Sequence, residues 1–472
     1  MLRIPKAHSF RVLPILLLSA LLGGCASGMN GYYAKLQEKL DAGEFEAAAK
    51  FVDGSRRKYG RKNVLLFYYD SGFVNHLAEN YERSTRSFES AKVRFDELNQ
   101  RSITAGVASM FFNDSTIPYQ GEDFERAHVN VFGALNFIGR LDPQGALIEA
   151  RQINALFRMF AAEGRFRNLY NDDGFIRYLM GLVYENGGEI NDAHISYMLA
   201  LRAYRNGIVS LSPPQDLIND AYTTALMLGM RDRAEEIKRD FPSARRAVIP
   251  SGHGELIIIN YNGMIPRKVE NVLEFALFDI WPYVNQVQVS TDEQRDFERA
   301  RSVAISAFAD TYIRVSFPRL ERIPNRVKSF SVTGGQSLRV HSYEAQDLAE
   351  IAEKILKDNI VQIYAKTLAR AAVKHVLGRN VSKAVGKQTN ETWGVLTQIF
   401  FNIFNSWTSV ADTRSWRTLP ENILMARIYL PAGENVVTVE YSDSNGQRLK
   451  SETFTVNIEN GRKTFKVLRS AM

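Results

Sequence analysis

The chain has 472 residues, a formal net charge of +7 at pH 7 and a single cysteine, Cys25. Hydrophobic residues make up 45% and charged residues 24%, which is typical of a folded, water-soluble body, and the length predicts two or three domains. The mild excess of cations gives no argument for nucleic-acid binding. One cysteine excludes a disulfide within the chain, so its stability must come from packed cores.

Residues 1–24 have the order of a secretory signal peptide: cations, an apolar run from Val12 to Leu22, then two glycines. The run is shorter than the roughly 20 residues that span a bilayer, which argues against an uncleaved transmembrane anchor. Leu22 to Cys25 resemble the lipobox of bacterial lipoproteins, in which the cysteine thiol receives a diacylglycerol. Ala26 follows instead of an aspartate, and the resemblance then implies the outer membrane, facing the periplasm. We expect a lipidated Cys25, with no cofactor or metal besides this acyl lipid.

Residues 25–247 show apolar residues at helical spacing between short Gly, Asn and Asp breaks. Self-similarity at a period of about 36 predicts a tetratricopeptide (TPR)-like solenoid of three to five helix hairpins. The clearest copy, residues 178–204, has small and aromatic residues at the expected positions, which favours this reading over a non-repeating helical array. The residues predicted to line a partner-binding groove are Tyr184, Tyr197 and Tyr204.

At Val248 the pattern changes to β-branched runs bounded by glycine, and one helix is expected over 290–310. Strands are predicted at 255–263, 274–278, 312–317, 330–333, 338–341 and 425–430. In the tail, Asn445-Gly446 and Asn460-Gly461 separate three alternating runs, which predicts an antiparallel meander. Residues 248–342 and 412–472 should therefore form a mostly antiparallel β domain, and the fold class is α+β.

Residues 343–411 are predicted to be a long helical insertion in that domain, a basic helix followed by an aromatic one. Polar amides in the aromatic part argue against a transmembrane span. Two interpretations stay open: contact with an anionic membrane or a partner, or internal packing of the aromatic helix with the cations in solvent. The candidate contact residues are Lys366, Arg370 and Lys374 on the basic face, and Trp393, Phe400, Phe404 and Trp407 on the aromatic face.

The stretch after the insertion carries Arg414, Trp416 and Arg417, which are residue types favoured as anchors in interfaces. We predict a partner-binding surface here, with burial of the tryptophan against the sheet as the alternative. The histidines are scattered without metal-ligand or catalytic spacing, and Ser251 to Gly254 is interpreted as a linker turn. No catalytic residue is predicted. Glu255 and Asp412 are the remaining carboxylate candidates, should the chain be an enzyme acting on peptidoglycan or glycan.

Several stretches together resemble a family of proteobacterial envelope lipoproteins with a TPR-like helical half and a C-terminal half. They are the lipobox, His253 to Gly263, Ala411 to Trp416, and Leu419 to Gly433. The resemblance covers nearly the whole chain after Cys25 and implies an envelope lipoprotein, but it transfers no activity and no functional residues.

We therefore expect a non-enzymatic scaffold for protein–protein interaction, anchored in outer-membrane lipid and working in cell-envelope assembly or maintenance. Its partners would be envelope proteins of unknown identity, with no nucleic acid among them. The alternatives are a membrane-active or oligomerising component acting through residues 359–411, and the cell-wall enzyme.

Overall fold

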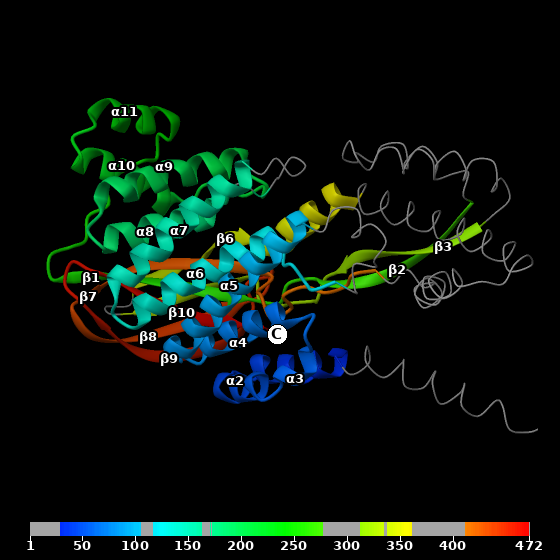
Figure 1. Cartoon of the computed structure of the whole chain (residues 1–472). Helices are drawn as coiled ribbons and strands as arrows, with labels where there is room; N and C mark the ends of the chain where they lie inside the picture. The colour runs from blue at the N-terminus through cyan, green and yellow to red at the C-terminus, as the bar shows by residue number, and fades with distance from the viewer. Residues whose placement is uncertain are drawn as a thin grey trace, which may run out of the picture.

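The structure, a computed structural model, describes residues 29–104, 117–162, 170, 172–276, 312–334, 338–360 and 411–471 (Figure 1). Its architecture is α+β: a helical half is followed by a mostly antiparallel β domain, as the sequence predicts. Within these residues, no helix is both long enough and apolar enough to cross a bilayer.

The described part of the helical half consists of five helix hairpins, and the short helix α3 (Arg56–Tyr59) follows the first of them. The hairpins are residues 29–41 with α2 (Phe45–Asp53), α4 (Val64–Leu77) with α5 (Tyr81–Thr104), α6 (Asp123–Gly139) with α7 (Pro143–Ala162), α8 (Gly174–Asn186) with α9 (Ile190–Asn206), and α10 (Gln215–Met227) with α11 (Arg231–Asp240). Each hairpin packs on the next, which confirms the prediction of a TPR-like solenoid.

Close approach of the two helices explains the repeated small residues. A Cβ at Gly72 would collide with the ring of Phe88, and one at Gly181 would collide with the ring of Tyr197. The two pairs have the same sequence separation, so the same contact recurs in two hairpins. In the first of them, Ser84 Oγ also donates to the carbonyl of Gly72 at 2.7 Å. The predicted repeat therefore rests on one packing rule, a glycine facing an aromatic ring.

Every hairpin turn contains a residue with positive φ. Three of the turns use glycine for this purpose, for example Gly188 at φ 82°, whereas the other two use Glu79 and Leu141, both at φ 58°. A side chain with a Cβ is strained in this conformation. Leu141 is 84% exposed, so its side chain gains little packing in return.

Changing Leu141 to glycine is expected to raise the free energy of unfolding by about 0.5–1 kcal/mol. Relief of left-handed strain is worth about 1–2 kcal/mol, and the extra freedom of glycine in the unfolded chain offsets part of it. Urea unfolding measures the change. Gly188→Leu is the matched control for the reverse change and should lose about 0.5–1 kcal/mol. A less stable Leu141→Gly variant would contradict this account.

The β domain contains two four-stranded sheets and a separate ribbon. The first sheet has the order β10 (Lys463–Ser470), β1 (His253–Asn262), β7 (Asn422–Pro431), β6 (Tyr343–Asp347); β1 pairs in parallel with β10, and the other pairs are antiparallel. The second sheet is antiparallel, with the order β5 (Leu338–His341), β4 (Ser329–Gly334), β8 (Gly433–Ser442), β9 (Arg448–Ile458). The ribbon is β2 (Arg267–Ala276) with β3 (Tyr312–Glu321), and it extends away from the body (Figure 1).

The predicted meander at the C-terminus is correct for one turn and wrong for the other. Asn445-Gly446 closes the β8–β9 hairpin, with Gly446 at φ 77°. After Asn460-Gly461, by contrast, the chain leaves this sheet, and β10 pairs with β1. The Gly461 amide donates to the carbonyl of His253 at 2.8 Å, so this turn is fixed against the start of β1.

The start of the predicted helical insertion is also different. Residues 343–347 are strand β6, and the helix begins at residue 348. The strand is held by long-range contacts, since the carbonyl of Ala345 accepts the Tyr204 hydroxyl at 2.7 Å and Gln346 Nε2 donates to Asp173 at 2.7 Å. Beyond residue 360, the predicted insertion lies outside the described residues as far as residue 410.

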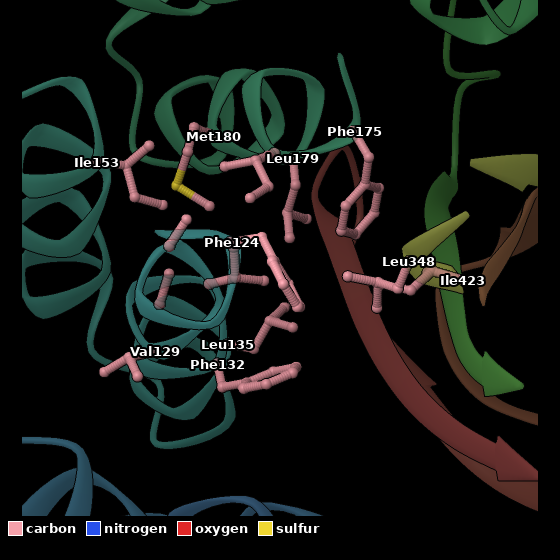
Figure 2. Packing of buried hydrophobic residues seen from close by; sticks show 14 of the residues in the cluster. Phe124, Val129, Phe132, Leu135, Ile153, Phe175, Leu179, Met180, Leu348 and Ile423 are labelled. Atoms are coloured by element: carbon pink, nitrogen blue, oxygen red, sulfur yellow. The ribbon is translucent and has the colours of Figure 1, made fainter. Parts of the chain in front are cut away.

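The first sheet is buried on both faces, which explains the nearly continuous apolar run in β1. Ile257, Ile259 and Tyr261 face the helices, whereas Leu256 and Ile258 face the second sheet. Figure 2 shows the helical side of this contact, where Phe124, Phe132 and Phe175 point toward Leu348 and Ile423. The first sheet is therefore a middle layer between the solenoid and the second sheet.

Candidate interaction site

The inner face of the solenoid is occupied by the protein's own chain. Residues 411–419, which we call the clasp segment, lie against the first three hairpins, and Trp416 of this segment is fully buried. Its ring stacks on Tyr69 with 4.4 Å between centroids and meets Phe132 edge-on at 5.7 Å. The clasp segment therefore covers part of the surface of these three hairpins.

Two buried carboxylates hold the clasp segment from opposite sides. Glu125 Oε1 accepts the Trp416 amide at 2.7 Å, and Asp70 Oδ1 accepts the Thr418 hydroxyl at 2.8 Å. Thr418 Oγ1 in turn accepts the indole N–H of Trp416 at 2.8 Å. The other oxygen of Asp70 accepts the hydroxyls of Tyr33 and Tyr59, both at 2.7 Å. Neutral donors thus satisfy both oxygens of Asp70.

Burial makes both carboxylates weak acids, because neither forms an ion pair with a cation of the described residues. It raises the pKa of Asp70 from 3.8 to about 6, and burial together with the charge of Glu122 raises the pKa of Glu125 from 4.5 to about 7. The folded state therefore binds these two protons more tightly than the unfolded state does. The contribution of the two protonated carboxyl groups to the free energy of unfolding is fully present below about pH 4. It is lost as the pH rises through 6 and 7.

We expect Asp70→Asn to be more stable than the wild type at pH 8, by about 2–3 kcal/mol, and close to it at pH 4. The amide removes the ionisation, and the three partners of Asp70 are hydroxyls that can rotate to meet an amide oxygen or N–H. Urea unfolding at several pH values measures the difference. If wild type and variant keep a constant difference between pH 4 and pH 8, the raised pKa of Asp70 is refuted.

A second buried cluster joins the solenoid to the first sheet. Arg427 of β7 contacts Glu255 at 2.7 Å, and it also contacts Asp220 and the hydroxyl of Tyr178. Lys463 of β10 binds the other oxygen of Glu255 at 2.8 Å. Burial alone would raise the pKa of Glu255, but Arg427 and Lys463 outweigh it and hold that pKa below its ordinary value. We call Arg427, Glu255, Asp220 and Lys463 the charge cluster.

The predicted partner surface around Trp416 is wrong for the tryptophan, which is buried. The alternative, burial against the sheet, is right about the burial, but the aromatic rings beside the indole belong to helices α4, α5 and α6. The two arginines lie at the rim of the clasp segment. Arg414 Nη2 pairs with Asp412 at 2.7 Å, and the Arg417 guanidinium covers the ring of Tyr33 at 4.5 Å. Arg414 Nη1 also donates to Asn63 Oδ1 of the solenoid at 3.2 Å, so both arginines hold the segment onto the solenoid.

The predicted groove tyrosines are also buried, so they do not line an open groove. Tyr184 accepts an amide N–H of Asn154, Tyr197 donates to Glu185 at 2.5 Å, and Tyr204 donates to the strand β6. Tyr184 and Tyr197 are buried by contacts within the solenoid, and Tyr204 by its contact with strand β6 of the β domain.

The remaining chemical candidates have structural partners. Glu255 belongs to the charge cluster, and Asp412 binds Arg414, which lowers its pKa against the effect of burial. The predicted linker turn is present at Ser251-Gly252, but His253 and Gly254 already belong to strand β1. In the described part of the chain, no group of His, Cys, Asp or Glu side chains is arranged to hold a metal ion. A cavity of about 20 Å³ between α8, α9 and β6 has room for about one water molecule.

The other predicted site residues lie outside the described residues, and these predictions stay predictions. They are Cys25, Lys366, Arg370, Lys374, Trp393, Phe400, Phe404 and Trp407. Conversely, Asp70, Glu125, Asp220 and Arg427 were not singled out from the sequence. The signal was there for Asp70 and Arg427, since each is a lone charge within an apolar run, a position that requires buried partners.

No known family model matches the chain, and no curated protein matches it. Several solved structures are similar to it, among them the MamA protein and YrrB. The MamA protein is 15% identical, covers 47% of this chain and 97% of its own, and has a TM-score of 0.28. YrrB, described as a TPR protein with an unusual peptide-binding site, is 15% identical, covers 47% of this chain and 95% of its own, and has a TM-score of 0.27. At these scores, neither match bears on what this chain binds.

Proposed function

We propose that the chain is a non-enzymatic scaffold for protein–protein interaction. In this proposal an acyl lipid on Cys25 holds it at the periplasmic face of the outer membrane, where it acts with other envelope proteins in assembly or maintenance of the cell envelope. The lipobox, Leu22 to Cys25, supports the anchor. The way in which the solenoid is joined to the β domain supports the role as a scaffold.

The observation that carries the proposal is the way in which the two halves are fastened together. Trp416 is buried among rings of the solenoid, and Arg427 bridges β7 to α10. A solenoid fastened in this way to a β domain keeps its outer surfaces at fixed distances from one another. Fixed spacing between contact surfaces is what a scaffold supplies to its partners.

The perturbed ionisable groups also favour a structural role. Strongly shifted carboxylates often indicate catalysis, but structural networks shift pKa values as well. Here Asp70 and Glu125 both bind groups of the clasp segment or of neighbouring helices, and each is fully buried. These two carboxylates therefore hold the clasp segment against the helices of the solenoid.

Two measurements on the native protein test the proposal. Mass spectrometry of the mature N-terminus should find Cys25 acylated, and crosslinking in intact envelopes should capture specific proteins in stoichiometric amounts. A variant with Cys25→Ala is the control, and it should lose the membrane fraction. An unmodified Cys25 would remove the anchor from the proposal, and crosslinking that captures no specific protein would remove the scaffold.

The two other functions make different predictions. Turnover of cell-wall fragments that is lost on Glu255→Gln or Asp412→Asn, with folding intact, would establish the enzyme instead. Binding to vesicles that is lost when Lys366, Arg370 and Lys374 are neutralised would establish membrane contact through the insertion.

A further inference from the structure

A group of five exposed cations lies at the first turn between hairpins. They are Arg56, Arg57, Lys58, Arg61 and Lys62, on and directly after helix α3, and we call them the basic patch. Between Gly54 and Tyr69 the sequence contains no acidic residue. Of the flanking acids, Asp53 pairs with Arg83 at 2.7 Å, and Asp70 is buried.

The basic patch is held on a fixed frame. Tyr59, at its centre, is 2% exposed and donates its hydroxyl to Asp70. The Lys58 amide donates to the carbonyl of Ser55 at 2.8 Å, and the carbonyl of Lys62 accepts the amide of Tyr119 at 2.8 Å. The backbone is therefore anchored at both ends of the patch, and the five side chains project from a defined surface.

None of the five cations forms an ion pair with an acidic group of the described chain. Two of them lie beside aromatic rings: Lys58 is 5.4 Å from the ring centroid of Tyr32, and Arg56 is 5.5 Å from that of Phe67. Rings leave the positive charge unneutralised, so the patch keeps its full attraction for anions.

The place of the basic patch relative to Cys25 identifies the anion. Tyr32 lies in the first turns of helix 29–41, and its ring contacts Lys58, so the patch lies at the end where that helix begins. Met29, the first described residue, follows Cys25 by four positions, a distance of at most about 14 Å in a fully extended chain. An acyl chain on Cys25 would therefore hold the patch close to the headgroups.

We propose that the basic patch binds anionic phospholipid headgroups of the leaflet that holds the anchor. The geometry of this inference rests on the proposed lipidation of Cys25. Clustered cations beside an anionic surface bind it electrostatically, and a basic patch is a common second signal beside an acyl chain. The contact orients the body, because it fixes the end of the solenoid that carries α3 against the membrane.

The test uses the chain from residue 26 onward, which contains every helix and strand described above and lacks the anchor. Its sedimentation is measured with vesicles of neutral phosphatidylcholine, alone or mixed with anionic phosphatidylglycerol. The patch variant changes all five cations to glutamine. The matched control changes five exposed arginines on α11 and after it, at the other end of the solenoid: Arg231, Arg233, Arg239, Arg245 and Arg246.

We expect the wild type and the control to bind the anionic vesicles and not the neutral ones, more weakly as the salt concentration rises. The patch variant should bind at least about tenfold more weakly. Equal binding by the patch variant and the wild type would overturn the inference and place any membrane contact elsewhere. The inference would also be overturned if the wild type failed to bind anionic vesicles, or if it bound neutral vesicles as well as anionic ones. Because this chain lacks Cys25, the result does not depend on whether that residue is lipidated.

Discussion

Replacing Trp416 with alanine is expected to lower the free energy of unfolding by about 3–5 kcal/mol. The indole is fully buried between the solenoid and the returning chain, so its removal leaves a cavity lined by Tyr69, Phe73 and Phe132. The loss should be at the level expected for a large core aromatic residue, because the indole is the largest buried side chain of the clasp segment.

Unfolding in urea, followed by circular dichroism, measures the loss, and the shape of the curve tests its cause. If Trp416 fastens the two halves together, the Trp416→Ala variant should unfold in two separate steps, whereas the wild type unfolds in one. Trp416→Phe should lose less, since it keeps ring contacts but loses the N–H bond to Thr418. Val436→Ala, at a position 62% exposed, is the control and should change little. A Trp416→Ala variant as stable as this control would show that the clasp segment contributes no stability.

Removing Arg427 is expected to have an effect of similar size. Arg427→Met should lower the free energy of unfolding by about 3–5 kcal/mol, because Asp220 would keep its charge inside the protein without a direct cation partner. Glu255 would retain Lys463. The loss should therefore come mainly from Asp220.

This origin can be checked by a second substitution. Asp220→Asn in the Arg427→Met background should recover part of the lost stability, whereas two unrelated substitutions would simply add. Without Arg427 the pKa of Asp220 should rise further, so the single variant should become relatively more stable as the pH falls. The matched control is Arg448→Met, which removes an exposed ion pair with Glu440 and should cost less than about 1 kcal/mol. Equal losses in the two arginine variants would refute the role given to the charge cluster.

The local parts of the fold could be predicted from the sequence. The helix hairpins follow from small and aromatic residues at a fixed spacing, because the residues in contact lie in one hairpin. Asn445-Gly446 predicted the β8–β9 turn for the same reason, since the two strands that it joins are consecutive.

The long-range parts could not be predicted in this way. Asn460-Gly461 has the same turn chemistry as the first pair, yet β10 pairs with β1 across the whole β domain. The alternation of apolar and polar residues in β10 predicts a strand, but it does not predict with which sheet that strand pairs. Trp416 is similar: its neighbours in sequence are polar, and its burial comes from Tyr69 and Phe132, far away in the chain. The candidate surfaces were misplaced because Trp416 and Tyr204 are buried by contacts with residues far away in the chain, Tyr69 and Ala345.

The pairing of β1 with β10 has a consequence for how the protein is made. The two strands are far apart in the chain, since Lys463 of β10 contacts Glu255 of β1 across 208 positions. Contacts of such high sequence separation form slowly, and until β10 pairs, β1 is an open edge of the first sheet that can pair with another chain and aggregate. Substitutions that weaken β10 should therefore reduce the yield of folded protein more than their effect on stability suggests.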